Sequence, residues 1–119
     1  MSNKGKRFED IIAWQKSQLI AKNIYKLFRK CKDYSFRDQI YRAVISISNN
    51  IAEGYEKGTN KDYTKFLFIA KGSCGEVRSM IYLAKDLKYI SEKNFYIIYE
   101  QSVEVSKIIY GIIKYINKK

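Results

Sequence analysis

The sequence has no histidine and no proline, and it has only two cysteines in 119 residues. Without histidine, the chain cannot form an imidazole–metal site, or a Ser-His or Cys-His nucleophilic pair. The cysteines, Cys31 and Cys74, lie 43 positions apart with no second metal ligand close to either one. Both fall within helical patterns and resemble small core residues, which fits a reducing cytoplasm.

Other absences narrow the class of protein further. Runs of apolar residues reach only four or five positions, far short of the roughly 20 needed to span a membrane. No apolar stretch follows the basic N-terminal segment, so no secretory signal is visible. The phosphate-binding pattern Gly-x-x-x-x-Gly-Lys is also missing. We therefore expect a cytoplasmic protein without enzymatic activity, and with no catalytic residue, metal or cofactor.

Lysine and arginine outnumber aspartate and glutamate by 23 to 12, which gives a formal net charge of +11. A protein with this charge attracts polyanions and associates with nucleic acid at low salt. The alternative is that the charged side chains only solvate the surface, as they do in the lysine-rich proteins that an AT-biased genome encodes. The charge balance is the main functional signal in the composition.

Apolar residues recur at three- and four-residue steps in four segments, which predicts four amphipathic helices. We expect these helices at about residues 10–31, 36–57, 61–88 and 92–117, within one domain spanning residues 1–119. Gly58 and Thr59 supply a C-cap and an N-cap between the second and third helices, and Ser91 caps the fourth. The predicted fold is all-α, an antiparallel up-down four-helix bundle with long helices.

The fourth helix carries more apolar surface than one small bundle needs. A nearly strict heptad seam is expected along Phe95, Ile98, Ser102, Val105, Ile109, Ile112 and Ile116. Three further isoleucines, Ile97, Ile108 and Ile113, lie off this seam. Such surplus apolar surface indicates contacts between subunits, and hence a homo-oligomer.

The segment SISNNIAEGYEKG, residues 46–58, interrupts the apolar pattern of the second helix with polar residues. Helical spacing places four of these and nearby residues in one polar stripe: Arg42, Ser46, Asn49 and Glu53. Asn50 borders this stripe. Glu53 and Glu76 together resemble the paired carboxylates of a diiron bundle, but such sites use Glu-x-x-His motifs and this chain has no histidine. A structural or interfacial role is therefore favoured over chemistry.

If the second and third helices are antiparallel about the Gly58 turn, Arg42 lies level with Glu76. We predict that these two residues form an ion pair, because a partly buried charge without a partner is costly. Gly72, Ser73 and Gly75 are predicted to let the two backbones approach closely at this level. Together with Asn50, Glu53 and Gly54, these residues form the predicted structural polar seam.

No base-reading motif is present: the sequence has no helix-turn-helix pattern, zinc finger or RNA-recognition signature. Nucleic-acid binding is therefore expected to depend on salt and to ignore sequence. The candidate contacts are Lys22, Lys26, Arg29, Lys30, Lys65 and Lys71. The eleven tyrosines beside basic residues could stack on unpaired bases, although packing at helix and subunit boundaries is the commoner role.

Three segments together resemble a known family: FEDIIAWQKS, then QIYRAVISISNNIAEGYEKG, then YTKFLFIAKGSCGEV. The chain is similar to the bacterial four-helix-bundle proteins encoded in intervening sequences of 23S ribosomal RNA genes. This family is related in fold to the accessory variability protein of diversity-generating retroelements. The characteristic positions of the family map onto Trp14, Arg42, Asn50, Glu53, Gly54, Gly72, Ser73 and Glu76. Cys74-Gly75 departs from the pattern, where larger or better helix-forming residues are usual.

The resemblance implies a ring-shaped homopentamer whose positive charge suits nucleic acid, with no established catalytic activity. Two hypotheses follow. In the first, the ring binds RNA or DNA through its basic surface. In the second, it is a scaffold that docks a protein partner such as a reverse transcriptase, and the charge is incidental. A membrane partner is not expected.

Overall fold

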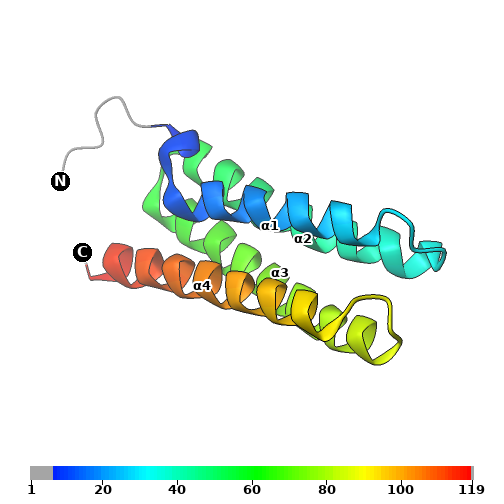
Figure 1. Ribbon diagram of the computed structural model, residues 1–119. Helices are drawn as coiled ribbons and strands as arrows, with labels where there is room; N and C mark the ends of the chain where they lie inside the picture. The colour runs from blue at the N-terminus through cyan, green and yellow to red at the C-terminus, as the bar shows by residue number, and fades with distance from the viewer. Residues whose placement is uncertain (1–6, 119) are drawn as a thin grey trace.

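The computed structural model describes residues 7–118, which form four α-helices and one short 3-10 helix (Figure 1). The elements are η1 (Phe8–Asp10), α1 (Ile12–Phe28), α2 (Tyr34–Glu56), α3 (Asn60–Asp86) and α4 (Glu92–Asn117). This part of the chain contains no strand, and its principal extents are 46, 20 and 20 Å. The predicted all-α, four-helix class is confirmed.

Two helices begin at positions that differ from the sequence-based expectation. α1 begins at Ile12 and not near residue 10, because Ile11 adopts an extended conformation with ψ of 122° and separates it from η1. α2 begins at Tyr34 and not at Phe36. The Asp33 side chain accepts a 3.2 Å hydrogen bond from the backbone N–H of Phe36, which caps the helix earlier than the apolar pattern indicates.

The other connections follow local capping rules. Gly58 has φ of 88° after the last turn of α2, a left-handed conformation that suits glycine. The Thr59 side chain then accepts a 3.1 Å hydrogen bond from the N–H of Asp62, and Ser91 accepts one of the same length from the N–H of Asn94. The N-caps predicted at Thr59 and Ser91 are confirmed.

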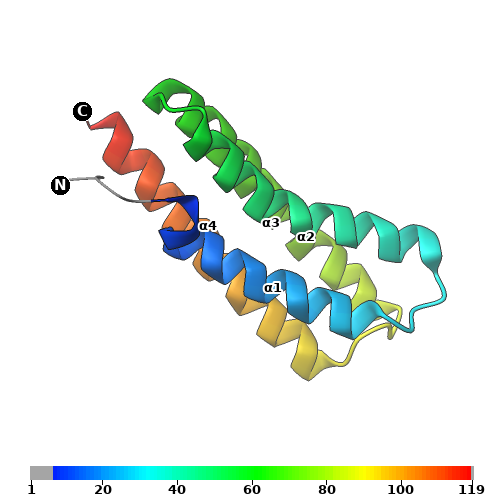
Figure 2. The same ribbon diagram turned by 90° about the horizontal axis from the view of Figure 1, so that it is seen from above.

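Each helix packs against two others, so that the four helices occupy the corners of the bundle. α1 contacts α2 and α4, and α3 contacts the same two helices. Within the described residues no Cα atom of α1 lies within 8 Å of one in α3, because these two helices lie at diagonal corners (Figure 2). A surface on α1 and a surface on α3 therefore face different directions.

The core consists of apolar side chains from all four helices, with fully buried members such as Ile20, Ile47, Leu67 and Ile109. Removing these side chains from water is the main favourable contribution to folding. Some buried serines are accommodated in the core because their hydroxyls bond to carbonyls of their own helix, as those of Ser17 and Ser102 do. Ser17, for example, donates a 2.6 Å hydrogen bond to the carbonyl oxygen of Ala13.

The apolar seam of α4 departs from the predicted heptad near its C-terminal end. Ile113, which was expected off the seam, is 2% exposed, whereas Ile112 and Ile116 are only partly buried. A helix of 3.6 residues per turn drifts relative to a strict seven-residue repeat, so the buried stripe moves by one position over several turns. Ile97 lies off the buried stripe, as expected, and is 43% exposed.

Within residues 7–118, none of the helices combines the length and the apolar composition that crossing a membrane requires.

Candidate functional site

The middle of the α2–α3 contact is a chain of hydrogen bonds between polar side chains. Asn50 donates from its amide nitrogen to the Ser46 hydroxyl and to the Ser46 carbonyl oxygen, each at 2.8 Å. The Ser73 hydroxyl donates to the Ser46 hydroxyl at 2.9 Å. Ser73 is 8% exposed, and Ser46 and Asn50 are partly buried, so this network joins the two helices at the edge of the core. Two predicted seam residues, Asn50 and Ser73, thus meet through Ser46.

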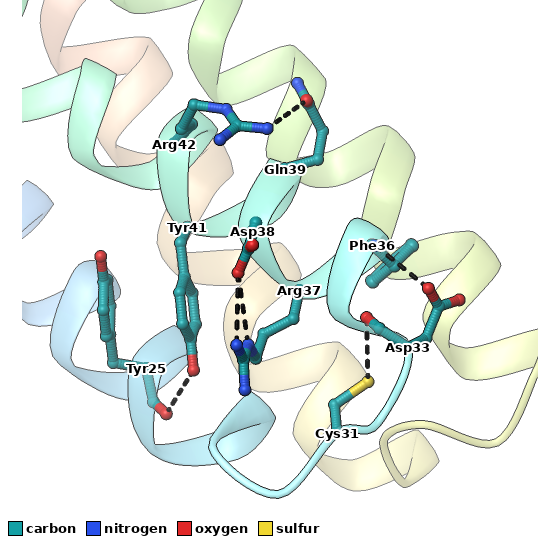
Figure 3. Close-up of polar contacts among 9 residues, drawn as sticks. All are labelled: Tyr25, Cys31, Asp33, Phe36, Arg37, Asp38, Gln39, Tyr41 and Arg42. Atoms are coloured by element: carbon teal, nitrogen blue, oxygen red, sulfur yellow. Dashed lines mark hydrogen bonds and ion pairs between the residues drawn. The ribbon is translucent and has the colours of Figure 1, made fainter.

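The predicted ion pair between Arg42 and Glu76 does not form. Gln39 lies between them, and its amide nitrogen donates to the Glu76 carboxylate at 2.7 Å. Its amide oxygen accepts from the Arg42 guanidinium at 3.4 Å (Figure 3). Both charged residues are exposed. Water therefore solvates them, and no direct partner is required. The prediction had the correct level along the helices but the wrong contact.

The two glycines predicted to bring the backbones together do not do so within this chain. A Cβ atom at Gly72 would meet nothing within 4 Å, and one at Gly75 would meet only the Arg78 guanidinium at 3.8 Å. The close approach lies instead at Gly54, where a Cβ would sit 2.6 Å from the Cβ of Phe66. Gly54 is buried against α3, while the neighbouring Glu53 is exposed.

The outer side of this seam is hollowed. A shallow depression of about 520 Å³ lies over α2 and α3, lined by Gln39, Arg42, Ser46, Asn49, Asn50 and Glu76. It offers hydrogen-bond donors and acceptors and one exposed guanidinium to whatever lies against it. Within the described residues, no group of three or more histidine, cysteine, aspartate or glutamate residues could hold a metal ion.

The six basic residues proposed from the sequence fall on two separate surfaces. Four are exposed on the outer side of α1 and the segment that follows it: Lys22, Lys26, Arg29 and Lys30. None of these four takes part in an ion pair with another described residue. Lys65 and Lys71 lie on α3, at the corner of the bundle diagonally opposite α1. The structure therefore does not bring the two groups together.

Lys71 belongs to a second basic surface between α3 and α4. It lines a hollow of about 260 Å³ with Ser106, Lys107 and Tyr110, and its ammonium lies 5.7 Å from the Tyr110 ring centre. One turn beyond Gly75, the Nη1 atom of Arg78 is buried without a hydrogen-bond partner among the described residues. An unpaired buried donor of this kind is unfavourable.

Sequence reasoning missed an arrangement of rings at the end of the bundle where α1 meets α2. The rings of Tyr25 and Tyr41 stack with centres 3.8 Å apart and an interplanar angle of 8°. The Arg37 guanidinium carbon lies 5.8 Å from the Tyr41 ring centre and 4.8 Å from that of Tyr34. Figure 3 shows Arg37 on the side of Tyr41 that faces away from Tyr25. We call these four residues, Tyr25, Tyr41, Arg37 and Tyr34, the aromatic column.

Hydrogen bonds hold the inner members of the aromatic column in place. The Tyr41 hydroxyl donates to the backbone carbonyl oxygen of Tyr25 at 3.3 Å, and Arg37 pairs with the Asp38 carboxylate at 3.4 Å (Figure 3). Partial burial raises the pKa of Tyr41 above its ordinary value, an effect that the charge of Arg37 partly offsets. Tyr41 therefore remains a neutral hydrogen-bond donor at physiological pH.

Residues 9–111 match the family model described as 23S rRNA-intervening sequence protein. The chain belongs to this family. The match includes the α2–α3 seam, the basic face of α1 and the whole aromatic column. The family resemblance drawn from the three sequence segments is thereby confirmed.

One protein of known crystal structure shares the fold of this 23S rRNA-intervening sequence protein. That protein is of unknown function and comes from the S23 ribosomal protein family of Bacteroides thetaiotaomicron VPI-5482. The two chains are 28% identical, and the TM-score is 0.81. The similarity covers 87% of this chain and 99% of that one. A comparison with curated proteins gives no match.

Proposed function

We propose that this family member is a non-catalytic, up-down four-helix bundle that assembles with copies of itself and binds RNA or DNA regardless of sequence. The observation that carries the proposal is the outer face of α1. Lys22, Lys26, Arg29 and Lys30 are exposed there without ion-pair partners among the described residues. Unpaired cations on one face form an electrostatic footprint for phosphates.

The up-down arrangement is supported by the order of contacts between helices. Moving toward the C-terminal end of α2, its residues meet positions that come earlier in α3, because Gln39 bonds to Glu76 and Ser46 bonds to Ser73. In the same way, Tyr82 of α3 packs on Phe95 of α4. Lys71, which comes earlier in α3, lies over the ring of Tyr110, which comes later in α4. Both orders of contact support opposite directions for the two helices of each pair.

Self-association is supported by the outer face of α3. Ile69 and Leu83 are 44% and 50% exposed, and by helical spacing they lie on one side of α3 with Gly72. Leu87, which follows the last turn of α3, is 48% exposed. Apolar surface of this kind beside a polar hollow is typical of an interface. Five copies, the number that the family resemblance implies, would carry a formal net charge of about +55, five times +11.

The test is fluorescence anisotropy with a structured RNA and a matched DNA duplex across a salt series. We expect micromolar or tighter affinity at about 150 mM salt. The logarithm of the binding constant should fall steeply with the logarithm of the salt concentration. Affinity that vanishes well below this salt concentration would overturn the proposal. The charge would then serve mainly to solvate the surface, and a protein partner would become the better candidate.

A charge-reversal triple variant locates the surface. We expect Lys26→Glu, Arg29→Glu and Lys30→Glu together to weaken binding by about tenfold or more and to reduce the salt slope by roughly three. The matched control reverses Lys57, Lys61 and Lys118, which are exposed near the α2–α3 connection and the C-terminal end of α4. Both of these segments lie at the end of the bundle away from the α1–α2 connection (Figure 1). Equal losses in both variants would show that net charge matters and that the α1 face does not.

A further inference from the structure

The aromatic column ends in two exposed rings. Tyr25 is 39% exposed and Tyr34 is 59% exposed, whereas Tyr41 and Arg37 between them are partly buried. The 3.8 Å separation of the Tyr25 and Tyr41 ring centres is close to the spacing of stacked bases in nucleic acid. A base that stacked on either end would therefore extend an existing stack.

The column is organised before any ligand binds. The hydrogen bond from Tyr41 to the Tyr25 carbonyl oxygen fixes one ring across the α1–α2 contact, and Asp38 holds Arg37 from its own helix. Because these groups are already ordered, binding would cost little side-chain entropy. The same contacts fix the direction that the outer faces of the stack present.

Cations surround the α1 end of the column. On a helix, Lys22 lies one turn before Tyr25 and Arg29 lies one turn after it, so both flank the ring on the same side of α1. Lys22, Lys26 and Arg29 are all exposed. A base stacked on Tyr25 would bring its own phosphate and the neighbouring phosphates close to these charges.

We propose that the aromatic column binds single-stranded RNA or DNA by stacking unpaired bases on Tyr25 and Tyr34, while the α1 cations bind the adjacent phosphates. This inference rests on the proposed function and deepens it, because it names the strandedness of the ligand and the residues that select it. The faces of bases in a duplex are covered by their neighbours, whereas every base in a single strand has a π-face available for an aromatic side chain.

The test uses anisotropy to compare three probes of equal length: a single strand, a duplex and a single strand of abasic sites. The salt concentration is about 150 mM, at which screening weakens purely nonspecific contacts. The protein variant is Tyr25→Leu with Tyr34→Leu, which removes both end rings but keeps every charge. The control is Tyr110→Leu, since Tyr110 is also exposed and lies beside Lys71 and Lys114 on the other basic surface.

We expect the wild-type protein to bind the single strand about tenfold or more tightly than the duplex or the abasic strand. The double variant should lose about tenfold or more on the single strand and little on the other two probes, and Tyr110→Leu should change none of them. A base analogue such as 2-aminopurine placed in the strand should be quenched by the wild-type protein and not by the double variant. Thermal melting of each variant confirms that it is folded.

Other outcomes separate this inference from the proposed function. Equal affinity for all three probes, unchanged in the double variant, would overturn base stacking and leave binding through phosphates intact. Loss of single-strand binding in Tyr110→Leu alone would also overturn it, by moving the site to the α3–α4 surface. No binding of any probe at this salt concentration would overturn the proposed function itself.

Discussion

The hydroxyl of Tyr89 donates a 2.7 Å hydrogen bond to the carboxylate of Asp33. Asp33 precedes α2 and Tyr89 lies between α3 and α4, so this bond joins the two connections at one end of the bundle. The same carboxylate accepts a bond from the N–H of Phe36 at the start of α2. The bond from Tyr89, followed by the bond from Phe36, holds the pKa of Asp33 below its ordinary value of 3.8.

This shift predicts a pH-dependent effect of Asp33→Asn on stability. The folded state binds the Asp33 proton less readily than the unfolded state does, so the charged form stabilises the fold above a pH of about 3.8. That contribution is lost as the pH falls through the lower pKa of the folded state. We expect the variant to melt below the wild-type protein near pH 7, with the difference shrinking at strongly acid pH.

Thermal melts followed by circular dichroism at both pH values would measure this difference. Glu100→Gln is the control, because Glu100 is an exposed carboxylate on α4; its difference from wild type should be small at both pH values. A difference for Asp33→Asn that is the same at neutral and acid pH would show that the Asp33 charge does not contribute.

Gly54→Ala should destabilise the protein. The new Cβ would lie 2.6 Å from the Cβ of Phe66, an atom fixed to its backbone, so α2 and α3 would have to separate. Overpacking of this kind typically costs about 1–3 kcal/mol. Urea denaturation would measure the loss, and wild-type stability in this variant would contradict the close approach of α2 and α3.

Gly72→Ala is the matched comparison, since a Cβ there meets nothing within 4 Å. In an open helical position, alanine is more favourable than glycine by about 1 kcal/mol. For the dissociated chain, at low protein concentration, we therefore expect a gain in the free energy of unfolding, whereas Gly54→Ala gives a loss. A gain that turns into a loss as the protein concentration rises would support the proposed self-association through this face of α3.

The two cysteines should react with thiol reagents at very different rates. Burial raises the pKa of the Cys74 thiol to about 11, although Arg78 and Lys71 partly oppose the shift. Because the thiolate is the nucleophile, a fully buried thiol with this pKa reacts slowly near neutral pH. Cys31 is only partly buried, so we expect iodoacetamide to label it first.

Peptide mass spectrometry over a time course would follow the labelling of each cysteine. In urea both cysteines should react at similar rates, because unfolding removes the burial that protects Cys74. Equally fast labelling of Cys74 in the native protein would mean that the core opens around α3 much more often than its complete burial indicates.

The helices were predictable because their signals are local. Thr59 and Ser91 cap helices through residues three positions away, and the apolar spacing alone identifies most of the buried faces. The prediction was less accurate where a small drift accumulates, as at Ile113. It also missed the earlier start of α2, because the Asp33 cap lies outside the apolar pattern.

The candidate site was less predictable because it depends on which side chains meet across helices. Helical register placed Arg42 level with Glu76, but register does not show that Gln39 reaches Glu76 first. The tyrosines of the aromatic column were visible in the sequence. Their stacking depends on how α1 and α2 are rotated toward each other, which spacing within one helix does not determine.

The diagonal placement of α1 and α3 has a consequence for avidity. A nucleic-acid strand bound along α1 and a neighbouring copy of the chain bound along α3 would occupy opposite corners of the same molecule. Strand binding and self-association would therefore not compete. In an assembly whose contacts leave the α1 corner uncovered, every copy would then keep its strand-binding corner free. One long strand could then bind several copies in succession, and the overall affinity would be much higher than the affinity of each single copy.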